Sequence, residues 1–218
     1  RDGSVWLGAD GIVYQVGRNR QPIRALATGG GSTMSMLAGR DGSLWAATSD
    51  GLYRWRPQAH ALEHVNLQGD KLPLRSTVHV LAQGPDGDIW AGTVKGLYRV
   101  PSGQSELVPV HSPPDSGLGN ASVAGLLFDR QDRLWLDTGV AGLHRMTYWD
   151  GKLARFDRVS ERHGIVNRPF GANLMQDRRG RIWTQIHVYD PATDQLTDLT
   201  SVDGADLGTG WFGSYAHL

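Results

Sequence analysis

The chain has 218 residues, which is long enough for one large domain or two small domains with a sizeable hydrophobic core. Its 22 Lys and Arg residues balance its 22 Asp and Glu residues, so we do not expect a broad basic face for nucleic acid or anionic lipid. Cysteine is absent, which excludes disulfides, thiol catalysis and zinc–thiolate sites. No stretch approaches about 18 consecutive apolar residues, and the polar first residues do not predict a signal peptide.

Glycine and tryptophan are over-represented. The chain contains 29 Gly, roughly twice the usual share of about 7%. It also contains 8 Trp but only 4 Phe. Together with many short apolar runs, this composition favours a repeated, turn-rich all-β design.

Five tryptophans recur at nearly constant spacing. Trp6, Trp45, Trp90, Trp135 and Trp183 are separated by 39, 45, 45 and 48 residues, and the sequences around them match. The third copy reads Asp-Gly-Asp-Ile-Trp-Ala-Gly-Thr-Val-Lys-Gly-Leu-Tyr. We expect these tryptophans to be structural, each packing between neighbouring sheets and burying roughly 150–250 Å².

Each repeat predicts two hairpin turns. The first repeat has an Asp-Gly turn at Gly3, a strand through Trp6 and a second turn that ends at Gly11. Asp-Gly supplies the positive φ values of a type I′ turn, and the later glycine permits a left-handed conformation. In the next three repeats the second-turn glycine is Gly51, Gly96 or Gly142, and in the fifth this turn is shortened.

Further strands flank each hairpin. A strand before the Asp-Gly turn is expected, in chain order, at residues 34–38, 78–82, 123–128 and 172–175. A looser fourth strand is expected at residues 23–27, 61–65, 106–110, 153–156 and 195–199. Four short strands in a repeat of about 45 residues are the pattern of a β-propeller blade, and helical periodicity is absent throughout.

The predicted fold class is therefore all-β, a single β-propeller unit over residues 1–218 with about five four-stranded antiparallel blades. The repeats lie near residues 1–33, 34–76, 77–121, 122–170 and 171–210. Residues 211–218 supply the first strand of a further blade or close the first blade. Two alternatives stay open: a five-bladed ring closed by the tail, and a piece of a longer propeller of six to eight blades.

The repeated sequence Asp-Gly-x-Leu-Trp-x-Gly-Thr-x-x-Gly-Leu-Tyr-Arg resembles the two-component regulator propeller repeat. Residues 86–99 match it almost letter for letter, and residues 41–54 nearly so. The resemblance covers essentially the whole chain. It implies the periplasmic sensor region of a bacterial membrane receptor whose output domain is a hybrid histidine kinase or a diguanylate cyclase (GGDEF) domain.

No output domain can be identified in this sequence, so we expect the chain to bind a ligand and not to catalyse a reaction. The resemblance implies a small-molecule or carbohydrate ligand and self-association through the parent receptor. From the balanced charge and the absence of a long apolar run, we expect no nucleic-acid partner and no membrane contact by this piece. The alternatives are a scaffold for protein–protein contacts and an enzyme resembling the streptogramin lyases, which use a metal and a histidine general base.

Two short motifs are rejected as cofactor sites. Residues His60 to His64 spell His-x-x-Glu-His, the pattern of inverted zinc peptidases, but they are expected in a fourth strand. Four strand residues span about 13 Å, so both imidazoles cannot reach one zinc at about 2.1 Å. Residues 208–213 spell Gly-x-Gly-x-x-Gly without the following helix that a dinucleotide site needs. We therefore expect no metal, no cofactor and no catalytic residues.

A ligand site is expected where loops lead into the first strand of each blade, because such loops converge in one concavity. The residues placed there are Met34, Thr77, His79, Asn120, Arg168, Asn173, Trp211 and Tyr215. The Arg168 side chain suits bidentate pairing with an anionic group. The Trp211 and Tyr215 rings suit stacking on a sugar.

Overall fold

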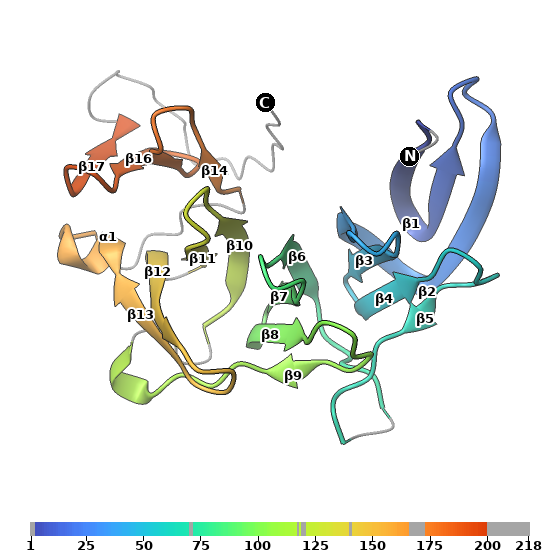
Figure 1. Cartoon of the computed structure of the whole chain (residues 1–218), viewed down its shortest axis with the longest axis horizontal. Helices are drawn as coiled ribbons and strands as arrows, with labels where there is room; N and C mark the ends of the chain where they lie inside the picture. Colours follow the sequence, from blue (N-terminus) through green and yellow to red (C-terminus); the bar gives the residue numbers. More distant parts are fainter. Residues whose placement is uncertain are drawn as a thin grey trace. The chain divides into compact units, whose positions relative to one another are not determined.

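Strands dominate the computed structural model, which describes residues 3–69, 72–116, 118, 121–139, 141–165 and 173–199. In these residues the strands form four sheets, each following the order of the chain (Figure 1). The fold is all-β, and three of these four sheets are four-stranded antiparallel sheets of the propeller-blade type.

The first sheet has five strands in the order β1-β2-β3-β4-β5. Its strands are β1 (Val5–Val16), β2 (Pro22–Ala38), β3 (Leu44–Thr48), β4 (Gly51–Trp55) and β5 (Glu63–His64). The second sheet contains β6 (Val78–Gln83), β7 (Ile89–Thr93), β8 (Gly96–Val100) and β9 (Val108–Pro109).

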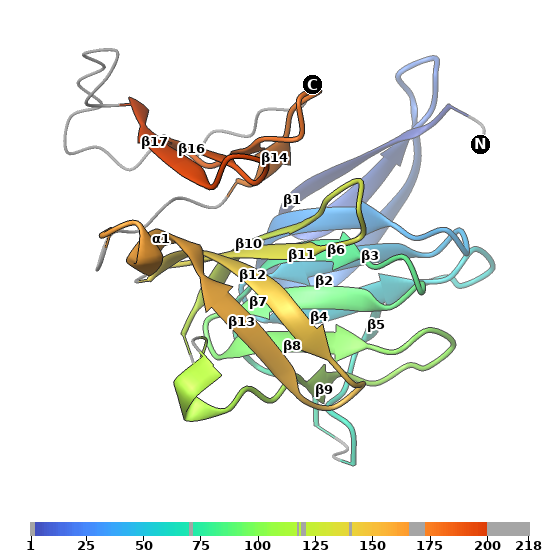
Figure 2. The same ribbon diagram turned by 60° about the vertical axis from the view of Figure 1, so that its left-hand side comes forward.

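The third sheet contains β10 (Val123–Phe128), β11 (Leu134–Thr138), β12 (Gly142–Trp149) and β13 (Ala154–Arg158). The fourth contains β14 (Met175–Gln176), β15 (Ile182–Trp183), β16 (His187–Asp190) and β17 (Gln195–Asp198). Two short helical turns interrupt the strands: η1 (Pro114–Ser116) and α1 (Val159–Arg162), which directly follows β13 (Figure 2).

The first repeat differs from the prediction. Strand β1 continues through the turn expected at Gly11, and β2 joins the strands expected at 23–27 and 34–38 into one (Figure 1). A tight turn closed by the Gly17 amide on the Gln21 carbonyl, at 2.9 Å, pairs β1 with β2. Gly29 and Gly30 have φ values of 65° and 110°, so they form a bulge that lets β2 pair first with β1 and then with β3.

The Asp-Gly turns are not of type I′, which is the second correction. A type I′ turn needs positive φ at both central residues, but at the turn of the second repeat only Gly42 has it, at 81°. The Gly42 amide donates to the Gly39 carbonyl at 3.0 Å, and the Gly39 amide donates to the Ser43 carbonyl at 2.8 Å. This is a three-residue loop whose last residue is left-handed. In the third sheet Asp132 takes that position, with φ 59°.

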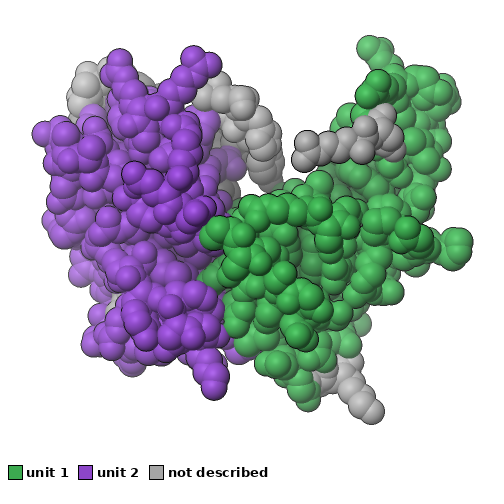
Figure 3. Space-filling view, viewed as in Figure 1, with its two compact units in different colours: residues 1–93, 98–108 green, residues 94–97, 109–218 purple. Residues whose placement is uncertain are grey.

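Two compact units make up the chain, residues 1–93 with 98–108 and residues 94–97 with 109–218 (Figure 3). In unit 1 a cluster including Trp45, Leu81 and Ile89 packs the first sheet against the second. In unit 2 a cluster including Trp135 and Tyr189 packs β11 and β12 against β15 and β16. Of the repeat tryptophans, Trp45, Trp90 and Trp135 are buried, whereas Trp6 and Trp183 are partly exposed.

The proposed closure of the first blade by residues 211–218 lies outside the described residues, as does the segment 166–172.

Candidate functional site

Four of the eight predicted ligand-binding residues are described. Met34 lies in β2, His79 lies in β6, and Thr77 immediately precedes β6, all in unit 1. Asn173 lies shortly before β14, in unit 2. All four are partly buried. Asn120, Arg168, Trp211 and Tyr215 lie outside the described residues.

The three residues of unit 1 lie where the chain enters the strands that pair with β3 and β7. The Thr77 hydroxyl donates to the Ser49 carbonyl at 3.3 Å, which ties the β3–β4 turn to the start of β6. Burial lowers the pKa of His79, so this imidazole is neutral at pH 7. This end of the sheets therefore offers a neutral, half-buried surface from Met34, Thr77 and His79.

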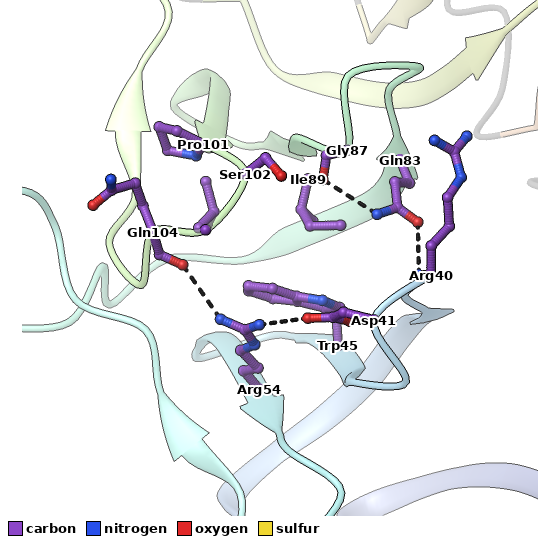
Figure 4. Close-up of a pocket in the computed structure, with 12 residues that line it drawn as sticks. Arg40, Asp41, Trp45, Arg54, Gln83, Gly87, Ile89, Pro101, Ser102 and Gln104 are labelled. Atoms are coloured by element: carbon purple, nitrogen blue, oxygen red, sulfur yellow. Dashed lines mark hydrogen bonds and ion pairs between the residues drawn. The ribbon is translucent and has the colours of Figure 1, made fainter.

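A cavity of about 260 Å³ lies at the other end of the same strands, within unit 1 (Figure 4). It is lined by the β2–β3 turn, β3 and β4 on one side, and by the end of β6, the start of β7 and the β8–β9 loop on the other. Its lining combines apolar residues such as Ile89 with polar ones such as Gln83. Sequence reasoning did not predict this site.

Arg54 is the central charged group of this cavity. Its guanidinium lies over the Trp45 ring at 4.6 Å, and Nη2 donates to the Asp41 carboxylate at 2.7 Å. Nε donates to the Ser43 hydroxyl at 3.2 Å. Nη1 donates to the Gln104 carbonyl at 3.3 Å (Figure 4). Burial alone would raise the pKa of Asp41, but hydrogen bonds from Ser43 and Arg54 lower it below its usual value. The cavity therefore holds an ionised pair.

Gln83 forms the neighbouring wall and joins the two sheets. Its Oε1 accepts the Arg40 amide at 3.0 Å, and its Nε2 donates to the Gly87 carbonyl at 3.2 Å. The Arg40 guanidinium donates to the carbonyls of Gly84 and Pro85, at 3.2 and 3.1 Å. We call this arrangement of Arg40, Gln83 and Gly87 the unit 1 clamp. It fixes the β2–β3 turn against the β6–β7 turn.

The same clamp recurs in unit 2. The Gln176 side chain accepts the Arg130 amide at 3.0 Å and donates to the Gly180 carbonyl at 3.3 Å. The Arg130 guanidinium donates to the carbonyls of Asp177 and Arg178, at 2.9 and 3.4 Å. We call Arg130, Gln176 and Gly180 the unit 2 clamp.

Unit 2 also contains two carboxylates that the sequence analysis missed. Asp129 Oδ2 accepts the Trp135 indole N–H at 2.8 Å and Arg133 Nε at 2.6 Å. Asp177 repeats this contact one sheet later, with the residues at the same offsets. Burial alone would raise the pKa of Asp129, but the bonds from Trp135 and Arg133 lower it overall. The spacing Asp-x-x-x-Arg-x-Trp was the sequence signal for this contact.

A second charged cluster ties α1 to the β16–β17 turn. Arg162 pairs with Asp194 and, at 3.2 Å, with Asp157. The Tyr189 hydroxyl donates to Asp194 at 2.8 Å, and His163 Nε2 lies 3.2 Å from the same carboxylate. Hydrogen bonds from Arg162 and Tyr189 hold the pKa of Asp194 well below its usual value. Because these charges pair with one another, we interpret the cluster as a structural contact that holds α1 against the β16–β17 turn.

In the described ranges, no group of three or more His, Cys, Asp or Glu residues could hold a metal ion. The segment 60–64 forms no helix, and His64 stacks on Tyr53 at 4.3 Å between ring centroids. Among the helical turns that the structure describes, none is long and apolar enough to cross a membrane.

Solved structures of extracellular domains share the fold. That of BT3049 from B. thetaiotaomicron, described as a hybrid two-component system, is 18% identical over 91% of this chain and 27% of that chain, with TM-score 0.69. That of BT4673, described likewise and from the same organism, is 20% identical over 84% and 25%, with TM-score 0.65. The chain has the fold of these extracellular domains. It spans about a quarter of their length.

A lyase shares the fold as well. Virginiamycin B lyase from Staphylococcus aureus is 13% identical over 90% of this chain and 66% of that chain, with TM-score 0.65. No family model and no curated protein matches the sequence. At these identities the comparisons establish the propeller fold.

Proposed function

We propose that the chain is a ligand-sensing propeller segment of the extracytoplasmic, periplasmic part of a bacterial two-component receptor. One observation carries the proposal: the fold is shared over 91% of the chain with the extracellular domain of a protein described as a hybrid two-component system. The repeated Asp-Gly-x-x-Trp sequence supports the same assignment, since it resembles the two-component regulator propeller repeat.

The proposed receptor ends in a histidine kinase, and this segment contributes recognition, not chemistry. Its ligand is a small molecule or carbohydrate bound by the loops that lead into the first strands. Met34, Thr77 and His79 support that placement, because they lie at one end of unit 1 with half-buried, uncharged side chains. Self-association through the parent receptor belongs to the same proposal.

A thermal-shift screen of the purified chain against sugars, oligosaccharide fragments, amino acids and divalent metals tests the sensor function. A ligand at 100 times its Kd stabilises the fold by about 2.7 kcal/mol, which such a screen detects. We expect R168A and W211A to lose the shift and K152A, which removes an exposed charge, to keep it. A folded sample that no compound stabilises would contradict the proposal.

Because virginiamycin B lyase shares the fold, the alternative function of a lyase-like enzyme needs a separate test. We expect the chain, with or without an added divalent metal, not to cleave quinupristin, the compound present in a solved structure of that lyase. Turnover that a His79→Ala substitution abolishes would instead establish a lyase-like enzyme.

A further inference from the structure

The Arg54 cavity has unused hydrogen-bond donors. A guanidinium carries five N–H groups. Within the described part of the chain, Arg54 uses three of them, on Ser43, Asp41 and Gln104. Ser102 is exposed at the rim, and among these residues its backbone amide donates to Asp88 whereas its hydroxyl makes no hydrogen bond. The cavity therefore presents two N–H groups and one hydroxyl to an acceptor.

The charge of the cavity favours an anion. Arg40 and Arg54 are permanently charged, and Asp41 is the one carboxylate among the residues that line the cavity. Hydrogen bonds already lower the pKa of Asp41, so this carboxylate is ionised and neutralises only one of the two guanidinium groups. The Arg54 side chain is only 14% exposed, and a charge-assisted hydrogen bond is stronger where water is largely excluded.

The walls set the size and the character of the ligand. The cavity of about 260 Å³ falls below the usual 300–1,000 Å³ range of ligand pockets, so it suits a small molecule. Ile89, Val100 and Pro101 form its apolar part. We propose that this cavity binds a small carboxylate whose acid group pairs with Arg54 and whose apolar part contacts these three residues. The role of the ligand rests on the proposed sensor function, whereas the binding itself does not.

Arg54 is also preorganised for such a contact. The ring of Trp45 supports one face of the guanidinium, and Asp41 fixes one edge (Figure 4). The bond to the Gln104 carbonyl is long, at 3.3 Å, so a ligand carboxylate can share this edge. An arginine held in this way loses little side-chain entropy on binding.

Benzoate and benzamide are matched probes, because they differ in charge but hardly in shape. The test is a ¹H–¹⁵N NMR titration of the whole chain at constant ionic strength. We expect benzoate to shift the indole N–H of Trp45 and the amides of Ser102 and Gln104 saturably, and benzamide to leave them unshifted. Equal shifts with both probes, or no saturable shift with benzoate, would overturn the proposal.

Variants connect the binding to this cavity. R54Q should abolish the benzoate shifts. R145Q should keep them, since Arg145 holds the corresponding place beside Trp135 in unit 2. Where R54Q does not fold, a second pair of variants tests the site. S102E should abolish binding by placing a like charge at the rim, whereas Q58E, which places the same charge at an exposed position outside the cavity, should retain it. Loss of binding in R145Q, or binding retained in S102E, would contradict the assignment. If benzoate does not bind this cavity but the thermal-shift screen finds a ligand, the cavity proposal is wrong and the proposed sensor function is retained.

Discussion

Asp129 organises a whole turn through one carboxylate. Its side chain is fully buried, and besides Trp135 and the Arg133 guanidinium it accepts the backbone amides of Gln131 and Arg133 at 2.9 and 3.0 Å. We expect D129N to lower the free energy of unfolding by about 2–3 kcal/mol, because the asparagine amide replaces a charged acceptor facing several donors. Urea denaturation measures this. Q131A, an exposed change in the same turn, should cost little, and an equal cost would contradict the role of the carboxylate.

The same residue predicts a pH dependence. Because the pKa of Asp129 is lower in the folded chain than in the unfolded chain, its ionised form stabilises the fold. This contribution is complete above the unfolded value of about 3.9 and is lost as the pH falls toward the folded pKa. We therefore expect the stability difference between the wild type and D129N to be full at pH 7 and to shrink below about pH 4. A difference that grows on acidification would contradict this cause.

At the scale of elements, the left-handed position in each of these loops determines how a substitution there changes the stability of the chain. Gly42 has φ 81°, and a Cβ there would meet Pro57 at 3.3 Å, whereas Asp132 holds the corresponding left-handed position with φ 59°. We expect G42A to destabilise the chain by about 1–2 kcal/mol and D132G to stabilise it by about 0.5–1 kcal/mol, because only glycine is unstrained there. Urea denaturation of both variants should give opposite signs. The same sign for both would show that these loops are not of one type.

These elements also show what the sequence could predict. The strands expected at 78–82 and 123–128 are β6 and β10, because each is a short apolar run bounded by turn residues. The loop type was wrong, since Asp-Gly suits both a two-residue loop and the last positions of a three-residue loop. The Arg54 cavity could not be predicted from the sequence, because it depends on a contact between Arg54 and Gln104, which is 50 residues away in the chain.

At the scale of the whole molecule, the clamps follow the division into two units. Arg40 with Gln83 lies in unit 1, and Arg130 with Gln176 lies in unit 2. At the intervening positions of the repeat the chain has Pro85 in place of the arginine and Phe128 in place of the glutamine. Proline has no N–H to donate, and phenylalanine has no amide to accept one. This clamp chemistry is therefore confined to each unit, which also has its own core.

Each clamp should accordingly stabilise only its own unit. We expect Q83A to lower hydrogen-exchange protection in β2–β4, β6 and β7 and to leave β10–β17 unchanged, because the Arg40 amide loses its acceptor, a loss of about 1 kcal/mol. We expect Q176A to do the reverse. Q58A, at an exposed glutamine of unit 1, is the matched control and should change neither set. If Q83A and Q176A lowered protection equally over the whole chain, the two units would unfold as one cooperative body and the clamps would not act locally.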